Sequence, residues 1–347
     1  MKVGIVTLPL HTNYGGILQA WALQTAIERM GHASSHVFRH LLGPLILYKD
    51  MSDAEIAAFQ RHTARFVDRY IRCDETPLGE IAPDRYDALV VGSDQIWRNR
   101  YTDFFHIGLR NAFLAFADGW NVRRVAYAPS FGIDAWEAAE TEIPACSALL
   151  RKFDAVSCRE ASGVKICREV LGVDAKLVPD PTLLLERADY AALVDAGETT
   201  APSGDLMAYV LDRDPEKRRL VEAVAAKSGL TPIYMNDHPD GSGLRVQPPV
   251  EQWLRNVRDA RAVVTDSFHA TVFSIVFRKP FVVTGNPTRG LARIGSLLAA
   301  LGLEDHLALS ADDFEPSRDY SVSDAAYVRL AKLRREGLDF LGEALKP

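Results

Sequence analysis

The sequence predicts an α/β fold in which mostly parallel sheets form two Rossmann-like domains facing each other across a cleft. Strand patterns alternate with amphipathic-helix patterns along the 347 residues, which is typical of parallel sheets covered by helices. The alternation restarts after the turn-rich stretch Glu198–Gly204, and the chain length suits about two domains. We therefore expect one domain at 1–190, another at 205–322, and a C-terminal segment at 323–347 whose helix packs back across the domain boundary.

In the first half, apolar runs predict strands and a periodicity of three to four residues predicts helices. Ser52 is predicted to be an N-cap, because Glu55 stands three residues later and completes a capping box. The expected strands are Lys2–Leu8, Ser35–Phe38, Asp87–Gly92, Val122–Ala128, Asp154–Cys158 and Lys176–Val178, and the expected helices are Gly15–Met30, Ser52–Ile71, Trp136–Phe153 and Glu160–Leu171.

The second half repeats this arrangement. Pro215 suits the first turn of a helix, where its missing N–H costs nothing. The expected strands are Asp205–Leu211, Thr231–Met235, Ala260–Thr265 and Phe281–Thr284, and the expected helices are Pro215–Ser228, Pro249–Val257, Ser267–Phe277, Leu291–Leu301 and Ser323–Leu345. Ligands of such sheets bind outside the carboxyl ends of the strands, so we expect the site there.

Composition excludes several classes of protein. The hydrophobic fraction is 48% and the charged fraction 25%, as in globular proteins and unlike disordered or collagen-like chains. The formal net charge of −6 disfavours nucleic acid as a partner, because such binders need a strongly basic surface. It also means that any site for a multiply charged anion must be positive locally.

Cysteine usage and the N-terminus favour a cytoplasmic protein. The four cysteines are dispersed without a C-x-x-C pair, so we expect reduced thiols and no metal held by cysteine. Asp212 and Asp214 have the D-x-D spacing of metal–nucleotide sites, but Pro215 makes Asp214 a predicted helix N-cap instead. The N-terminus lacks the pattern of a signal peptide, and no apolar stretch approaches the ~20 residues that span a bilayer.

The stretch Ala260–Lys279 is the first candidate for chemistry. Asp266 and Ser267 are both good N-caps between an apolar strand and an apolar helix, so His269 falls in the first helical turn. Unpaired backbone N–H groups at that point favour phosphate or carboxylate. His269 is either a proton-transfer group near neutral pH or a capping histidine satisfied by the backbone.

Two loops of the first half offer polar groups at strand ends. Asn13 and Tyr14 precede Gly15 and Gly16, and these glycines allow a close backbone approach to a ligand. The alternative is a tight strand-to-helix turn. Ser130 follows the strand Val122–Ala128 and is expected at the same edge of the sheet.

Ser93, Asp94 and Gln95 come directly after the buried strand Asp87–Gly92. Uncommitted polar side chains at such a position suit the hydroxyls of a sugar. The alternative makes Asp94 a helix N-cap and Trp97 a core residue.

Three arginines are candidates for holding an anion. Arg159 follows the strand Asp154–Cys158, and it either reaches into a binding site or forms a surface pair with Glu160. Arg289 and Arg293 stand at the start of a late helix, and they are either aimed at the cleft by the preceding turn or are solvated helix charges.

In its motifs, the chain resembles the polysaccharide pyruvyl transferase family. The matching segments are TLPLHTNYGGILQAWAL, YDALVVGSDQIWR, YAPSFG, VSCRE followed by GV, VPDPTLLL, and VVTDSFHATVFSIVFRKPFV followed by RI at Arg293. They occur in the family's order across roughly residues 1–300.

The resemblance implies a fold like that of GT-B glycosyltransferases and transfer of the enolpyruvyl unit of phosphoenolpyruvate onto a sugar. The acceptor would be a polysaccharide or a lipid-linked oligosaccharide precursor, which could bring the enzyme to the membrane periphery. Neither a cofactor nor a metal is needed. His269 and Asp94 would be catalytic, Asn13 would help to orient the acceptor, and the donor would bind at Arg293, Ser267, Phe268 and Arg159. The acceptor would meet Tyr14, Gly15, Gly16, Ser93, Gln95 and Ser130.

One departure from the family pattern concerns the donor. Members often have D-R-L-H, whereas this chain has Asp266, Ser267, Phe268 and His269. Ser267 cannot supply the arginine's charge, so either Arg293 or Arg159 compensates or this subgroup uses another donor or acceptor. The alternatives are a nucleotide-sugar glycosyltransferase of the same fold and a non-catalytic sugar-binding protein of a polysaccharide pathway.

Overall fold

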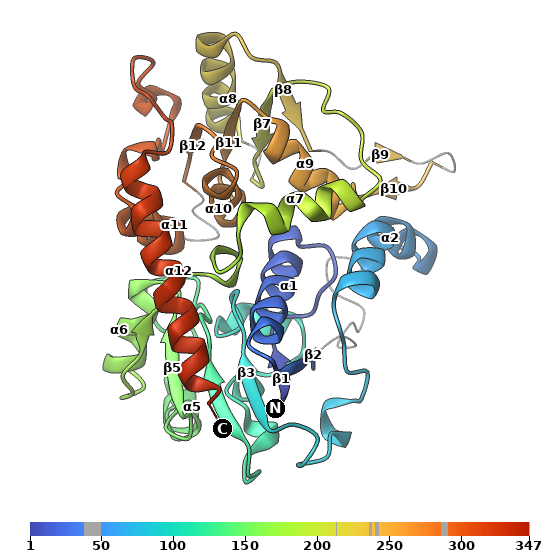
Figure 1. Ribbon diagram of the computed structural model, residues 1–347, viewed down its shortest axis with the longest axis vertical. Coiled ribbons are helices and arrows are strands. Elements are labelled where there is room, and N and C mark those ends of the chain that lie inside the picture. The colour runs from blue at the N-terminus through green and yellow to red at the C-terminus, as the bar shows by residue number, and fades with distance from the viewer. Residues whose placement is uncertain (38–49, 213, 236–237, 240–242, 286–290, 347) are drawn as a thin grey trace. The chain divides into compact units, whose positions relative to one another are not determined.

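The computed structural model describes residues 1–37, 50–212, 214–235, 238–239, 243–285 and 291–346 (Figure 1). The chain forms two compact α/β units. The first unit comprises Met1–Ala57, Ala64–Leu185 and Leu333–Pro347, and the second comprises Ala58–Thr63 and Glu186–Lys332. The turn-rich stretch at 198–204 lies within the second unit.

The first unit is built on a six-stranded parallel sheet with the order β2-β1-β3-β4-β5-β6. Its strands are β1 (Lys2–Val6), β2 (Ala33–His36), β3 (Ala88–Val91), β4 (Arg123–Ala126), β5 (Ala155–Cys158) and β6 (Lys176–Leu177). Its helices are α1 (Tyr14–Arg29), most of α2 (Asp53–Tyr70), α3 (Asn99–Phe104), α4 (Leu109–Ala112), α5 (Ile143–Leu150) and α6 (Ala161–Glu169). The neighbouring strands of this sheet pair in parallel, so their carboxyl ends share one edge.

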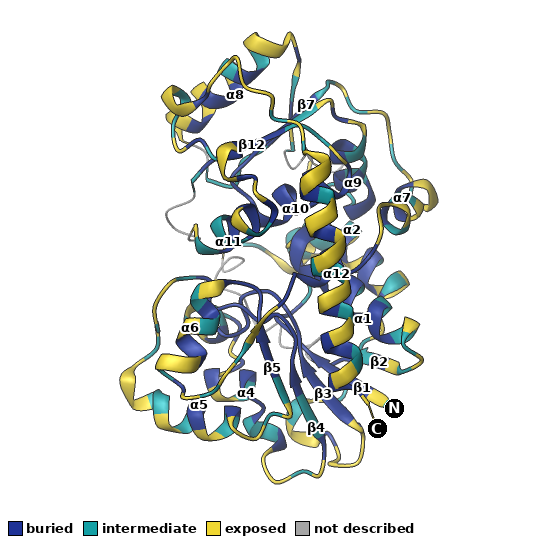
Figure 2. Ribbon diagram, turned by 60° about the vertical axis from the view of Figure 1, so that its left-hand side comes forward, coloured by how far each residue is buried: buried dark blue, intermediate teal, exposed yellow. Residues whose placement is uncertain are grey.

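The core of this unit lies between the sheet and its covering helices. Val3 and Ile5 of β1 pack with Leu23 and Ile27 of α1, and all four side chains are fully buried. Figure 2 shows the strand β3 buried along its whole length. A strand covered on both faces needs a continuous apolar run, which explains the pattern Ala88–Val91.

The second unit has a four-stranded parallel sheet with the order β12-β11-β7-β8. Its strands are β7 (Leu206–Tyr209), β8 (Pro232–Tyr234), β11 (Ala262–Thr265) and β12 (Phe281–Val283), and a separate antiparallel ribbon joins β9 (His238–Pro239) to β10 (Arg245–Val246). Its helices are α7 (Arg187–Ala196), α8 (Pro215–Ser228), α9 (Val250–Asp259), α10 (Phe268–Val276) and α11 (Ala292–Leu301).

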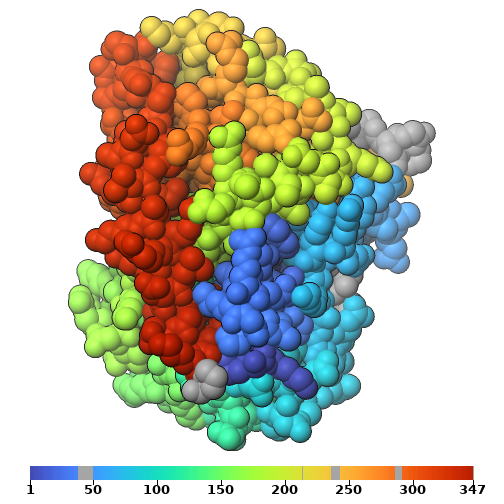
Figure 3. All heavy atoms as spheres, viewed as in Figure 1, coloured from blue at the N-terminus to red at the C-terminus, as the bar shows by residue number. Residues whose placement is uncertain are grey.

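The last helix, α12 (Asp324–Ala344), contributes residues to both units. In the first unit, Arg334 donates from Nε to the carbonyl of Leu183 at 2.8 Å and from Nη2 to that of Leu185 at 3.0 Å. In the second unit, Arg329 donates to the carbonyl of Leu301 at 2.7 Å. The outer side of the helix is exposed along its length (Figure 3). No helix in the described part of the chain is both long and apolar enough to cross a membrane.

Close packing of α12 in the first unit leads to a stability prediction at Gly337. A Cβ atom there would stand 2.7 Å from the Tyr127 hydroxyl and 2.9 Å from Leu184 Cδ2. We expect Gly337→Ala to lower the free energy of unfolding by about 1–3 kcal/mol, because the tight core must move. Gly342→Ala is the matched control in the same helix, since a Cβ there meets nothing within 4 Å. Urea denaturation that ranks the two variants in the opposite order would contradict this packing argument.

Most expected elements are confirmed, with differences at their ends. The capping box of Ser52 and Glu55 is present, with both reciprocal bonds. The helix expected at Trp136–Phe153 is wrong in its first half, because a 3₁₀ turn at Glu140–Glu142 precedes α5. The sequence prediction also missed α7, and it missed α3 and α4, which are too short to show a clear period.

Candidate active site

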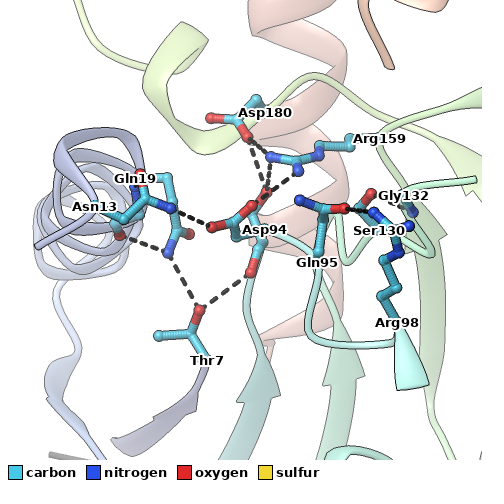
Figure 4. A network of polar contacts seen from close by, with 12 residues as sticks. Thr7, Asn13, Gln19, Asp94, Gln95, Arg98, Ser130, Gly132, Arg159 and Asp180 are labelled. Carbon is cyan, nitrogen blue, oxygen red and sulfur yellow. Dashed lines mark hydrogen bonds and ion pairs between the residues drawn. The ribbon is translucent and has the colours of Figure 1, made fainter. Parts of the chain in front are cut away.

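Polar residues converge at the carboxyl edge of the six-stranded sheet (Figure 4). Thr7 follows β1, Asp94 follows β3, Arg159 follows β5, and Asp180 lies two residues beyond Val178 after β6. Parallel strands bring these positions to one edge although the chain separates the first and last by more than 170 residues, as their numbers show. The arrangement is therefore a product of strand order and not of local sequence.

Asp94 stands at the centre of this network. Its Oδ1 accepts from Arg159 Nη2 at 3.1 Å, and its Oδ2 accepts from Asn13 Nδ2 at 3.3 Å. Its backbone adopts φ 63°, a left-handed conformation that few residues other than glycine tolerate. Asp94 is not the N-cap of a helix, because α3 begins only at Asn99 with Arg98 as its cap. The carboxylate is thus held by two side chains from other elements.

Arg159 lies inside this network and not on the surface. Its Nη1 donates to Asp180 Oδ2 at 2.7 Å, and its Nε stands 3.8 Å from Glu160 Oε2. The surface pair with Glu160 that the sequence left open is therefore wrong, since both side chains are fully buried. Burial opposes the charge, but Asp180, Asp94 and Glu160 outweigh it and raise the pKa of Arg159. The guanidinium remains charged.

Asp180 is a member of the network that sequence reasoning did not single out. Its Oδ1 accepts from the Thr182 backbone N–H at 3.0 Å and hydroxyl at 2.6 Å, while its Oδ2 accepts from Ser93 Oγ at 2.9 Å. Ser93 is completely buried, and its hydroxyl donates to this carboxylate. The signal available in the sequence was an aspartate directly after a predicted strand, in the segment VPDPT.

The β1–α1 loop positions Asn13. Asn13 is the N-cap of α1 and accepts from the Gly16 N–H at 3.1 Å, which leaves its amide nitrogen for Asp94. A Cβ at Gly16 would stand 3.3 Å from Asp94 Oδ2, so glycine keeps this corner open for the carboxylate. Tyr14 and Gly15 are buried in the first turn. The loop is therefore a tight strand-to-helix turn, and its cap residue donates to Asp94.

Gln95 and Ser130 form a second group beside Asp94. Gln95 Oε1 accepts from Arg98 Nη1 at 3.0 Å, and Ser130 Oγ accepts from the Gly132 N–H at 3.0 Å. The Ser130 N–H also bonds the carbonyl of Asp94 at 2.9 Å. Trp97, by contrast, is a core residue whose ring stacks on Phe113 at 4.9 Å.

In the second unit, the turn between β11 and α10 holds the other group of expected site residues. Ser267 is the N-cap, and its hydroxyl accepts from the Ala270 N–H at 3.4 Å. His269 lies in the first turn, with its ring 5.1 Å from that of Phe268. The guanidinium of Arg293, on α11, stands 5.8 Å from the Phe268 ring and is buried. Arg293 is therefore not a solvated helix charge, while Arg289 lies outside the described residues.

Asp266 has a supporting role that the sequence did not specify. Its carboxylate accepts from the backbone N–H groups of Leu211 and Asp212 at 2.7 and 3.1 Å, and from Lys217 Nζ at 3.0 Å. It therefore ties the loop after β7 and the helix α8 to the turn that carries His269. The capping role belongs to Ser267 alone.

A family model for polysaccharide pyruvyl transferases matches residues 13–287, which contain every expected site residue except Arg289 and Arg293. The chain belongs to the polysaccharide pyruvyl transferase family. It is accordingly a transferase enzyme, and the family supports a role in polysaccharide pyruvylation. No curated protein matches the chain.

Solved structures similar to this pyruvyl transferase show its fold. Arabidopsis thaliana UGT89C1 complexed with UDP-L-rhamnose has 11% identity and a TM-score of 0.52, over 99% of each chain. The E. coli heptosyltransferase WaaC with ADP-2-deoxy-2-fluoro heptose has 13% identity and a TM-score of 0.40, over 84% of this chain and 92% of that one. Acinetobacter baumannii MurG has 10% identity and a TM-score of 0.42, over 99% and 94%. The first match, with the two parallel sheets, shows the GT-B fold that the sequence predicted.

The D-x-D pair Asp212 and Asp214 stands directly before α8. Asp214 is the N-cap of α8, as expected, and accepts from the Lys217 N–H at 2.9 Å. Among the described residues, no three histidine, cysteine, aspartate or glutamate side chains are grouped to hold a metal ion.

Proposed function

We propose that this enzyme transfers the enolpyruvyl unit of phosphoenolpyruvate to sugar hydroxyls of a polysaccharide or its precursor. The product would be a cyclic pyruvate ketal, with phosphate released. The observation that carries this proposal is the Arg293 guanidinium beside Phe268, in the same unit as His269 at the N-terminus of α10. A helix N-terminus and a guanidinium both favour an anion, and the acidic chain needs such a local positive site.

The donor carries a phosphate and a carboxylate, and each suits one of these groups. A guanidinium grips either anion through two parallel hydrogen bonds. The backbone N–H groups after Ser267 donate to the other anion at the helix N-terminus. Arg293 thus supplies the positive charge that the arginine of the D-R-L-H motif supplies in other members of the family.

His269 is the proposed acid. A proton added to the methylene carbon of the donor turns it into a methyl group and makes C2 electrophilic, and a sugar hydroxyl then attacks C2. Phosphate leaves as the C2–O bond breaks, and a second hydroxyl closes the ketal. The two hydroxyl protons balance the one gained by the methyl group and the one leaving with phosphate. His269 delivers a proton to carbon or phosphate in this scheme.

Asp94 is the proposed group for the acceptor. Its carboxylate accepts from Arg159 and from Asn13, and it can accept a hydroxyl proton or orient the sugar. Gln95 and Ser130 lie next in the same loop network. Tyr14, Gly15 and Gly16 form the turn that holds Asn13, and Ser93 fixes Asp180 behind it.

This scheme uses phosphoenolpyruvate as a co-substrate and needs neither metal nor cofactor. A cytoplasmic location is part of the proposal, and the four free cysteines are in keeping with it. The sulfurs of Cys158 and Cys167 are 3.6 Å apart and form no disulfide. An acceptor linked to a lipid would bring the enzyme to the membrane surface through its substrate.

The donor assignment is tested by calorimetric titration of phosphoenolpyruvate into wild type and Arg293→Lys. We expect the lysine variant to bind about tenfold to a hundredfold more weakly, because an ammonium cannot form the paired hydrogen bonds. One lost hydrogen bond to a charged group corresponds to ~1.5–3 kcal/mol. Arg261→Lys, at an exposed arginine of the same unit, is the matched control. Equal affinity in wild type and Arg293→Lys would remove Arg293 from the donor site.

The departure at Ser267 supports a second candidate and gives a further arm to the test. Ser267→Arg should partly restore donor affinity to the Arg293→Lys variant if both positions serve one site. A serine there also favours a nucleotide-sugar glycosyltransferase, whose diphosphate would use the same helix N-terminus. Phosphate release from phosphoenolpyruvate supports the first candidate and nucleoside diphosphate release from a sugar nucleotide the second. If neither phosphate nor nucleoside diphosphate is released, the result would indicate a non-catalytic sugar-binding protein.

A further inference from the structure

The surroundings of Arg159 have the wrong charge for an anion site. One guanidinium faces three carboxylates, those of Asp94 at 3.1 Å, Asp180 at 2.7 Å and Glu160 at 3.8 Å. The cluster therefore carries an excess of negative charge with Arg159 included. A phosphate or carboxylate placed there would be repelled at short range in a poorly solvated setting.

Exposure separates the members of this cluster. The side chains of Arg159 and Asp180 are 0% exposed, whereas that of Asp94 is 6% exposed. A bound substrate can thus reach the Asp94 carboxylate, while Arg159 and Asp180 lie behind it. Figure 4 shows the guanidinium of Arg159 between the carboxylates of Asp94 and Asp180.

Arg159 links two carboxylates, and that of Asp180 is held by further hydrogen bonds. The Asp180 carboxylate accepts from Ser93, from Arg159 and from two groups of Thr182. Arg159 spans from there to Asp94 Oδ1, and Asn13 holds Oδ2 from the other side. Since each oxygen of Asp94 has a directed donor, the carboxylate has one orientation.

We infer that Arg159 is a positioning residue, which bridges Asp180 to Asp94 and fixes the Asp94 carboxylate toward the acceptor, and that it does not bind the donor. This inference rests on the proposed function for the role of Asp94. It replaces the donor role that the family resemblance implies for Arg159. The charged donor is then left to Arg293 in the second unit.

The charged groups near Asp94 determine its electrostatic environment. Within the first unit, the charged groups of the network are Arg159, Asp180 and Glu160, and Arg98 follows in the same loop, paired with Glu137 at 3.3 Å. His11 precedes the Asn13 loop and is neutral at pH 7, because burial lowers its pKa to about 4. In the described part of the first unit, Arg159 is the cation that donates to Asp94.

The first test follows the Asp94 carboxyl carbon by ¹³C NMR, assigned through Asp94→Asn. In wild type and in D180N the resonance should stay that of a carboxylate from roughly pH 4.5 to 8, above the ordinary aspartate pKa of ~3.9. In the double variant R159Q/D180N, which conserves the net charge of the cluster, its midpoint should rise by about 1–3 pH units relative to D180N. D154N, at an exposed aspartate before β5, is the control. An unchanged titration in R159Q/D180N would overturn the inference.

The second test separates this role from donor binding and monitors folding by near-UV circular dichroism. We expect R159K and D180N to keep wild-type affinity for phosphoenolpyruvate, while kcat falls about tenfold or more and the acceptor KM rises. A tenfold loss of donor affinity in R159K would overturn the inference. If wild type binds no phosphoenolpyruvate, the proposed function fails, but the carboxyl titration still decides the role of Arg159 because it needs no turnover.

Discussion

Replacement of His269 by alanine should lower kcat by about 10²–10⁴ while the fold stays intact, if His269 transfers a proton in the reaction. The position supports this size of effect, because the imidazole lies in the first turn of α10 in the same unit as the Arg293 guanidinium. An acid held next to the donor acts without the entropy loss of a bimolecular encounter. The measurement is phosphate release from phosphoenolpyruvate at saturating acceptor.

The pH profile and a matched variant make this result specific. The kcat profile of His269→Ala should lose the limb that belongs to this histidine, whereas donor affinity should change much less than kcat. His106→Ala is the control, since His106 is exposed in the first unit. Unchanged turnover in His269→Ala would reduce this residue to a structural part of the helix N-terminus.

Replacement of Arg159 by glutamine should lower the free energy of unfolding by about 3–5 kcal/mol. The substitution leaves Asp94, Asp180 and Glu160 near one another without their cation, in a site where burial makes charge costly. Arg110→Gln is the control, because its pair with Glu142 is half exposed and such pairs contribute ~0–1 kcal/mol. Urea denaturation at neutral pH measures both.

The pH dependence of this loss has a definite sign. Without Arg159, like charges and burial raise the folded-state pKa of the carboxylates above the unfolded value. A group of that kind stabilises the fold at low pH and loses this contribution as pH rises through its folded pKa. The deficit of Arg159→Gln should therefore be smaller near pH 5 than at pH 8. A deficit that stays constant over this range, or one below 1 kcal/mol, would contradict the buried-cluster interpretation.

Local sequence was sufficient to predict most of the elements and the polar residues that follow the strands. Hydrophobic periodicity reports which face of a segment is buried, so β3 and α8 were predicted within about two residues of their ends. Capping is also local, and Ser52, Asp214 and Ser267 cap their helices as expected. Asp94 and Asn13 were expected at strand ends, and they lie there 3.3 Å apart.

Only the tertiary structure decided which of these groups meet. The order β2-β1-β3-β4-β5-β6 brings Asp180 next to Arg159 and both next to Asp94, and no local pattern encodes that order. The two arginines illustrate the limit, because each follows a strand or opens a helix and has an alternative as a surface charge. Arg159 is buried against three carboxylates and Arg293 is buried beside the Phe268 ring, so neither is a surface charge. The charge and solvation around a side chain come from segments distant in sequence, so they appear only once the chain is folded.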